Sequence, residues 1–311
     1  MYFYKLAFLN FSLKYIFISF RTIVSSLISI ILPFVHGRYL EEVLRSIECQ
    51  GYDKYEVIAI NDRGNDSISK IITNYGAFEI MAAGSLLKAR YMASMKSNGS
   101  KIFFLDETRP LIRDDALEII SKNNSDIIFI REEEVKINLI SKVSNIDKQS
   151  VFSIDNINSL KPYVLPRIYN RPIALKSLEL VKSKLGPVYE WAQIMPEDLF
   201  IYHEARKLSN NFSIETKLLM KHYGDFTLRD MVRKYYRYGR GFGIASFTRY
   251  RDIGRLSSLD RLNGKLNVPK SSKDKFLLVM FLGVKGLSGI IGEKSEKIRI
   301  RHKLRHGENL F

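Results

Sequence analysis

Short apolar runs alternate with amphipathic stretches along the chain from about residue 28 onward. Each run holds mostly aliphatic or aromatic residues between turn-forming positions, which predicts a β-strand. The predicted strands are Ile28–Leu32, Val57–Ile60, Phe78–Met81, Ile102–Leu105 and Asp126–Ile130. Apolar residues at helical spacing predict the helices Tyr39–Gln50, Ser67–Asn74 and Ser85–Ser97 between them. This alternation indicates an α/β domain with a mostly parallel sheet flanked by helices.

The pattern changes after residue 130. Residues 131–169 are polar, rich in Asn, Ser and Ile, and lack a clear period, which predicts an edge hairpin or a mobile loop. Helices are predicted again at Ser177–Leu185 and Glu197–Leu208, and Thr227–Tyr238 begins a basic segment. We therefore divide the chain into an N-terminal apolar segment (1–24), an α/β domain (25–215) and a basic helical module (216–311).

The positive charge of the chain is concentrated at its C-terminal end. The whole chain carries 49 Lys and Arg against 33 Asp and Glu, a net charge of +16. Residues 216–311 hold 22 of these basic residues and 8 of the acidic ones, a balance of +14. The positive electrostatic field around such a segment attracts polyanions, including anionic lipid headgroups and nucleic acid. The sequence contains no nucleic-acid-binding motif and little aromatic interleaving in its basic tail, so no nucleic-acid partner is expected.

Two apolar stretches suggest contact with a membrane surface. Lys5 and Lys14 interrupt the N-terminal stretch, and Lys285 interrupts the stretch from Phe276 to Gly292. The second stretch is marginal in length for a hydrocarbon core of about 30 Å and precedes a basic run, which favours a helix lying in the interface. We expect a peripheral protein on anionic lipid at the cytoplasmic face of the cell membrane.

The chain contains one cysteine, which excludes an internal disulfide bond and fits a reducing compartment. Cys49 lies on the apolar side of a predicted helix, so we expect a buried structural thiol.

Acidic residues occur at three places where α/β sheets bind ligands. Asp62 follows the strand EVIAI. Asp106 and Glu107 follow the strand KIFFL, and Glu197 and Asp198 open a predicted helix. Taken singly, each acid has a structural alternative, since acids also cap turns and stabilise helix N-termini. Their joint order along the chain favours a binding site at the carboxyl ends of the strands.

With these acids in place, residues 29–241 resemble the family-2 glycosyltransferases, whose core is the nucleotide-diphospho-sugar transferase (GT-A) fold. The segment ISIILPF looks like the family's first strand, which places Pro33 in the nucleotide-binding set. The segment EVIAINDRGND looks like the strand and acidic turn that hold the base and ribose, so the resemblance gives Asp62 that role. Arg90, in LLKARYMA, is similar to the arginine that approaches the diphosphate.

The segment IFFLDETRPL occupies the place of the family's Asp-x-Asp motif. The resemblance implies Mg²⁺ or Mn²⁺, which neutralises charge on the leaving diphosphate, with Asp106, Glu107 and His222 as ligands. Thr108, however, stands where the second acid of the motif is expected. A hydroxyl is a poor replacement for a carboxylate. Three outcomes stay open: Glu107 or His222 completes a weakened site, metal dependence is reduced, or catalysis is lost.

The segment MPEDLFIYHEAR resembles the family's Glu-Asp motif in the acceptor region. By this resemblance Asp198 is the general base that takes the proton from an acceptor hydroxyl, and Glu197 orients the acceptor or the helix. The segment KYYRYGRGFG looks like the family's Tyr-x-x-Gly-x-Gly region. Arg237 and Arg240 within it are candidates for a phosphate clamp, because a guanidinium group offers a planar fork of donors.

The resemblance implies an inverting, hexosyltransferase-like enzyme. It would transfer a sugar from a nucleoside-diphosphate sugar to a hydroxyl of a lipid-linked or surface glycan. Two alternatives remain. Thr108 also fits a catalytically impaired relative that binds a nucleotide sugar or a partner enzyme. The C-terminal charge also fits a basic protein that binds a membrane surface or nucleic acid.

Overall fold

The computed structural model describes residues 24–34, 37–61, 64–81, 85–152, 165–191, 196–224, 227–251, 253, 269 and 271–306. For residues 24–26, 151, 152, 190 and 191 it describes the backbone alone. Asp62 and all but the last residue of the N-terminal segment 1–24 lie outside the described residues.

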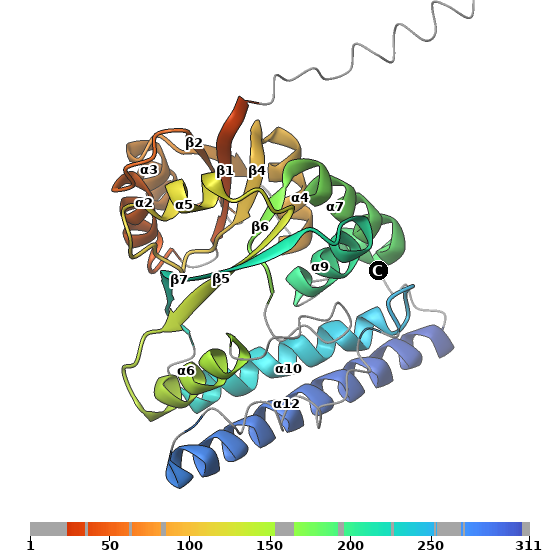
Figure 1. The fold of residues 1–311 in the computed structure, drawn as a ribbon. Helices are drawn as coiled ribbons and strands as arrows, with labels where there is room; N and C mark the ends of the chain where they lie inside the picture. The colour runs from red at the N-terminus through yellow and green to blue at the C-terminus, as the bar shows by residue number, and fades with distance from the viewer. Residues whose placement is uncertain are drawn as a thin grey trace, which may run out of the picture.

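A seven-stranded sheet forms the centre of the described structure (Figure 1). Its strands are β1 (Val24–Phe34), β2 (Tyr55–Asn61), β3 (Phe78–Met81), β4 (Gly99–Phe104), β5 (Ile127–Glu134), β6 (Ile168–Asn170) and β7 (Phe212–His222). They lie in the order β3-β2-β1-β4-β6-β5-β7. All neighbouring pairs are parallel except the two that β6 makes with β4 and β5. The α/β class expected from the sequence, a mostly parallel sheet flanked by helices, is confirmed.

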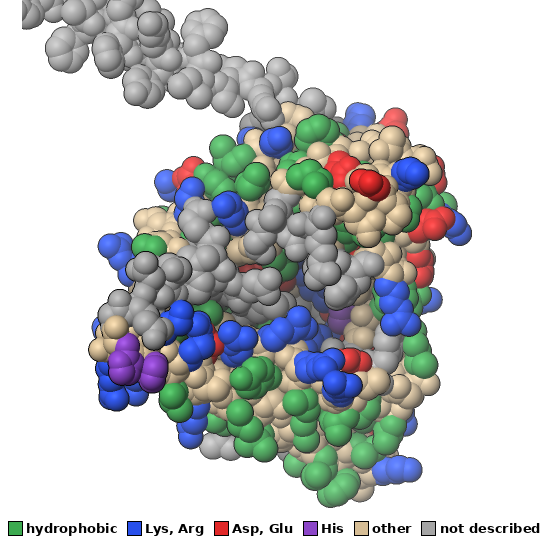
Figure 2. Space-filling model, turned by 180° about the vertical axis from the view of Figure 1, so that it is seen from behind, with side chains coloured by type: hydrophobic (Ala, Val, Ile, Leu, Met, Phe, Trp, Pro, Cys, Tyr) green, Lys and Arg blue, Asp and Glu red, His purple; other side chains and the backbone are tan. Residues whose placement is uncertain are grey.

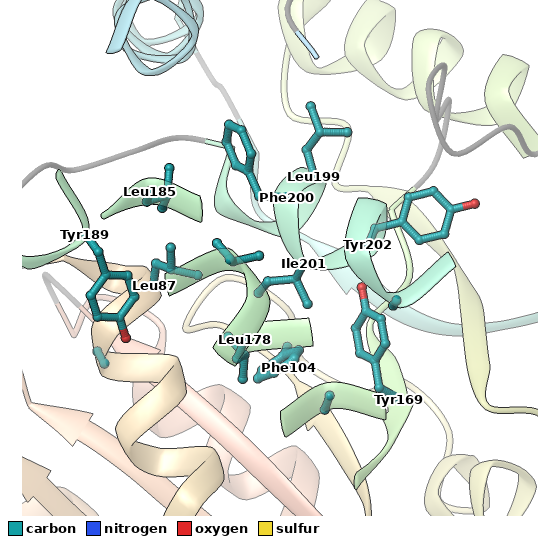
Figure 3. Close-up of a cluster of buried hydrophobic side chains, with 14 of the residues drawn as sticks. Leu87, Phe104, Tyr169, Leu178, Leu185, Tyr189, Leu199, Phe200, Ile201 and Tyr202 are labelled. Carbon is teal, nitrogen blue, oxygen red and sulfur yellow. The ribbon is translucent and has the colours of Figure 1, made fainter. Parts of the chain in front are cut away.

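Helices cover both faces of the sheet. One face carries α2 (Leu40–Glu48), α3 (Asp66–Asn74) and α5 (Ala116–Lys122), and the other carries α4 (Leu86–Lys96), α7 (Arg171–Leu185), α8 (Val188–Trp191) and α9 (Glu197–Leu208). Strand β4 shows why the sheet needs both layers. Ile102 and Phe104 belong to one core, whereas Phe103 belongs to the other, because successive side chains of a strand point to opposite faces. Figure 3 shows part of the first core, around Phe104.

A separate helical layer lies beyond the sheet (Figure 1). It consists of α6 (Leu139–Phe152), α10 (Leu228–Ala245) and α12 (Ser272–Arg305). Helices α10 and α12 run side by side, and their backbones are in contact. A Cβ atom on Gly239 or Gly292 would overlap the main chain of the other helix, so glycine is needed at both positions. Arg240 Nε also donates to Glu296 Oε2 across this contact at 2.8 Å. Helices α10 and α12 thus form a packed pair, whereas residues 216–222 of the expected basic module belong to strand β7.

The polar segment after residue 130 contains regular structure that its sequence pattern did not predict. Strand β5 continues to Glu134, and α6 follows after four residues. The backbone N–H of Ser141 donates to the Asn138 side chain at 3.0 Å, which satisfies a free group at the start of the helix. The expected edge hairpin or mobile loop is therefore wrong for residues 131–152. Cys49 is exposed at the C-terminal end of α2, so the expected buried thiol is also wrong.

Candidate functional site

Charged side chains gather at the edge of the sheet where its parallel strands end. Strands β1, β2, β4, β5 and β7 share one direction, so their carboxyl ends meet there. Asp106 follows β4. Arg167 precedes the antiparallel strand β6, and its carbonyl accepts a hydrogen bond from the N–H of Phe104 at 2.8 Å. The reversed direction of β6 is thus what brings Arg167 to the edge occupied by Asp106.

Glu197 and Asp198 lie in the first turn of α9 and share a buried arginine from α4. Arg90 Nη1 is 2.9 Å from Glu197 Oε1 and also pairs with Asp198 Oδ1. Arg90 and Glu197 are 1% and 4% exposed, whereas the side chain of Asp198 is 15% exposed. Burial lowers the pKa of Arg90, and the charge of Glu197 opposes that shift. Asp198 is therefore the acid that a ligand can reach, and Glu197 lies beneath it.

Asp198 has a second cationic partner at this edge. Arg167 Nη1 is 3.1 Å from Asp198 Oδ2 and 3.9 Å from Asp106 Oδ2. The carboxylates of Asp106 and Asp198 thus face one guanidinium group between them. This single arginine connects the two acidic motifs to which the resemblance gives roles at the donor and the acceptor.

The Asp106 carboxylate is fully engaged. Its Oδ1 accepts hydrogen bonds from the Thr108 N–H at 3.1 Å and from the Thr108 hydroxyl at 2.5 Å. Its Oδ2 pairs with Arg109 Nη1. Thr108 therefore serves as a hydrogen-bond donor to Asp106, where the family motif would place a second acid.

A line of ion pairs continues from Arg109 along β5 to β7. Arg109 Nε is 2.8 Å from Glu132 Oε2, and Lys148 Nζ lies 2.7 Å from Glu132 and 2.8 Å from Glu134. His222 Nδ1 is 3.0 Å from Glu134 Oε2. Burial acts to raise the pKa of Glu134, but the hydrogen bond with His222 and the charge of Lys148 outweigh it and lower the pKa to about 2. Burial, with the charges of Arg109 and Lys148, holds the pKa of His222 well below its usual value.

The three residues expected to bind a divalent cation do not form a ligand set. Both Asp106 oxygens have donors, and Glu107 Oε2 accepts the N–H of Gly37 at 2.6 Å. His222 is 5% exposed and its Nδ1 contacts Glu134 and Lys148. In the described ranges no three His, Cys, Asp or Glu side chains are placed to hold a metal ion together. These residues, as arranged, do not fit Mg²⁺ or Mn²⁺.

The remaining candidates for donor binding are dispersed. Pro33 lies near the end of β1, paired in register with Ile60 of β2. Arg240 pairs with α12, and Arg237 is exposed on α10. Burial raises the pKa of the next residue, Tyr238, and the charges of Lys234 and Arg109 oppose the shift. The structure brings together Asp106, Asp198, Glu197 and Arg90 from the predicted set.

The sequence did not predict three of the cations at this edge, Arg109, Arg167 and Lys148. Arg109 carries a weak signal, since it lies three residues after Asp106 in the segment DETR. Arg167 and Lys148 carry none, because both lie in the segment that was expected to be a hairpin or loop. Their positions depend on β6 and α6, which no periodicity indicates.

The buried His222 predicts a measurable pH dependence of stability. The unfolded chain takes up a proton on this imidazole near pH 6.5, whereas the folded chain does not, because the folded pKa is far lower. The free energy of unfolding should fall by about 1.4 kcal/mol between pH 7.5 and pH 5.5 through this group alone. Urea unfolding of His222→Gln should lack that decrease. His302→Gln, at an exposed position of α12, should retain it. Equal pH slopes for the wild type and His222→Gln would contradict the assignment.

Comparison with known proteins returns solved structures of similar topology. No family model matches the chain, and no curated protein matches it. A structure of TarS residues 1–349 from S. aureus is 15% identical, covers 92% of this chain and 93% of its own, and has a TM-score of 0.49. A mannosyltransferase from Pyrobaculum calidifontis with GDP-Man and Mn²⁺ is 10% identical, covers 89% of this chain and 75% of its own, and has a TM-score of 0.45.

A third similar structure is glucosyl-3-phosphoglycerate synthase from Mycobacterium tuberculosis with Mn²⁺, UDP and its glucosylated product. It is 11% identical, covers 75% of this chain and 82% of its own, and has a TM-score of 0.44. The named ligands and the manganese ion belong to those proteins. At these identities and TM-scores the likeness assigns neither a family nor an activity to this chain.

Proposed function

We propose that the protein is a GT-A glycosyltransferase that moves a sugar from a nucleoside-diphosphate donor to a hydroxyl group. The observation that supports this proposal is the meeting of Asp106, Asp198 and Arg167 at the carboxyl edge of the sheet. Open α/β sheets bind ligands at this edge. The sequence resemblance independently assigns the first acid to the donor and the second to the acceptor.

The chemistry follows from which acid is accessible. Asp198 takes the proton of the acceptor hydroxyl as its oxygen attacks the anomeric carbon. The bond between that carbon and the diphosphate breaks, and the diphosphate leaves with the electron pair. One base is sufficient for a direct displacement, which inverts the anomeric centre. Glu197 holds Arg90 beneath Asp198 and so positions it. The nucleoside would lie toward Pro33, near the end of β1, and Asp62 would bind it.

The acceptor would be lipid-linked or carried by a surface glycan at the cytoplasmic leaflet. Helix α12 is long and apolar enough to cross a membrane, by length and composition only. Its contact with α10 along Gly239 and Gly292 favours a helix that lies on the surface instead, because crossing would separate the two helices. The net charge of +14 on residues 216–311 complements anionic lipid.

One face of α12 is suited to enter the lipid headgroup region. Phe276, Met280, Leu287 and Ile291 are exposed, and spacings of four, seven and four residues place them on one side of the helix. The opposite side is buried, at positions that include Leu278. Figure 2 shows apolar side chains gathered at the end of the molecule formed by α10 and α12, with lysine and arginine side chains beside them. This surface would bring the site to a membrane-bound acceptor.

Binding of nucleoside diphosphates tests the proposed activity most directly. We expect at least one of UDP, GDP, ADP and CDP to raise the melting temperature, since a ligand at 100 times its dissociation constant stabilises the folded state by about 2.7 kcal/mol. The corresponding free nucleosides serve as controls and should stabilise less. Absence of any shift across this panel would reject the glycosyltransferase and favour a protein that only binds membranes.

A further inference from the structure

Two guanidinium groups meet at the Asp106 carboxylate, where a cation is expected to neutralise the donor diphosphate. Arg109 Nη1 pairs with Oδ2, and Arg167 Nη1 lies 3.9 Å from the same atom. Arg109 comes from the turn after β4 and Arg167 from the residue before β6. Their side chains are 11% and 10% exposed, and that of Asp106, which both contact, is 22% exposed, so the three groups are shielded from bulk solvent.

We propose that Arg109 and Arg167 bind the donor diphosphate and neutralise the leaving group in place of a divalent cation. The proposal rests on the proposed glycosyl transfer and adds the chemistry of its donor site. A guanidinium group presents its N–H donors in a planar fork that matches phosphate oxygens in pairs. In a partly buried site such a contact is only weakly screened by salt.

The ion-pair network can release both arginines without leaving a buried acid unpaired. When Arg109 turns to the phosphate, Lys148 still contacts Glu132 at 2.7 Å. When Arg167 turns, Asp198 still has Arg90. A buried charge that loses all partners is costly, so this second set of contacts makes the exchange feasible. Asp106 keeps its two hydrogen bonds from Thr108.

The same geometry disfavours a metal ion bound to Asp106. A divalent cation at Oδ2 would have to replace the contact that Arg109 Nη1 makes with this oxygen. The cation would then lie close to two positive guanidinium groups, those of Arg109 and Arg167. Thr108 offers a neutral hydroxyl in place of the carboxylate that would offset this repulsion. Thr108 in place of the motif's second acid and the two arginines, Arg109 and Arg167, therefore act together to exclude a metal ion from Asp106.

The exchange would also prepare the general base. Arg167 contacts Asp198 Oδ2 at 3.1 Å in the described structure. Its movement to the diphosphate removes one of two cations from Asp198 and so makes the carboxylate a better proton acceptor. Donor binding would then precede activation of the acceptor.

Calorimetric titration with the nucleoside diphosphate that binds best tests the proposal. The full-length wild type is titrated in EDTA and again in Mn²⁺, alongside Arg109→Gln and Arg167→Gln. We expect equal affinity in the two buffers for the wild type and at least a tenfold loss in each variant. Affinity for the free nucleoside should not change, which shows that the variants remain folded. Arg109→Lys and Arg167→Lys should fall between.

Arg206→Gln is the matched control, because Arg206 stacks on Phe212 away from Asp106. It should bind the diphosphate as the wild type does. If EDTA abolishes wild-type binding, and both glutamine variants bind normally with Mn²⁺, a metal ion performs this role and the proposal is wrong, while the glycosyltransferase stands. If the wild type binds no nucleoside diphosphate in either buffer, both the proposal and the glycosyltransferase are rejected.

Discussion

Asp198→Asn is expected to lower the rate of sugar transfer by about 10²- to 10⁴-fold, the usual contribution of a general base. Asparagine keeps the size and hydrogen-bonding capacity of the side chain but cannot take a proton. Donor affinity should not fall, because the base acts on the acceptor and Arg167, its partner, stays available to the diphosphate. The measurement is release of nucleoside diphosphate from its sugar conjugate in the presence of a lipid extract, with donor affinity determined separately.

Two further variants provide comparisons for the transfer rate of Asp198→Asn. Glu197→Gln should reduce transfer less but lower stability, because it leaves the charge of the buried Arg90 with one partner fewer. Asp230→Asn, an exposed acid in the first turn of α10, should behave as the wild type. Near-normal transfer by Asp198→Asn would reject it as the base and make Glu197 the next candidate.

Replacing Phe276, Met280, Leu287 and Ile291 together with Ser is expected to weaken binding to anionic liposomes at least a hundredfold. Each apolar side chain buried in the interface contributes on the order of 1 kcal/mol or more, and four together exceed the charge contribution of any single lysine. The buried side of α12 is unchanged, so helix packing and melting temperature should be preserved. Cosedimentation with vesicles of mixed neutral and anionic lipid provides the measurement.

Phe78 and Met81 provide a matched control on the other side of the molecule. Both are exposed apolar residues of β3, at the edge of the sheet. Changing them to Ser should leave liposome binding intact. If the fourfold α12 variant sediments with vesicles as fully as the wild type, the membrane contact lies elsewhere, with the N-terminal segment 1–24 as the first alternative.

The central sheet could be predicted from sequence because its strands are buried on both faces. Such strands read as continuous apolar runs, as the buried stretches Val57–Ile60 of β2 and Ile102–Phe104 of β4 do. The edge strand Phe78–Met81 is largely exposed but also has the predicted bounds. Helix α9 also has the predicted bounds, Glu197–Leu208. Strand β7 was missed, since most of its residues before Leu219 are partly or fully exposed. Strand β6 was missed because a segment of three residues is too short to show a periodic pattern of apolar side chains.

The candidate site was predictable only for its acids and for Arg90. Asp106 and Asp198 follow recognisable elements and belong to motifs, so their types and order carry a signal. Arg167 reaches them through an antiparallel strand inserted between β4 and β5, which local pattern cannot indicate. His222 was expected to bind metal, yet β7 places it in a buried contact with Glu134. Such partners are set by topology and not by spacing.

The insertion of β6 also constrains how the chain can fold. Strands β4 and β5 are consecutive in the sequence but do not pair, because Ile168–Asn170 lies between them. Neither strand can complete its hydrogen bonding on that side until the chain has been made through residue 170. Pairing over such sequence separations is slow, and apolar strand edges that wait for a partner invite association with other chains. Ile102–Phe104 and Ile127–Ile130 are therefore the segments where aggregation would begin if synthesis or refolding stopped early.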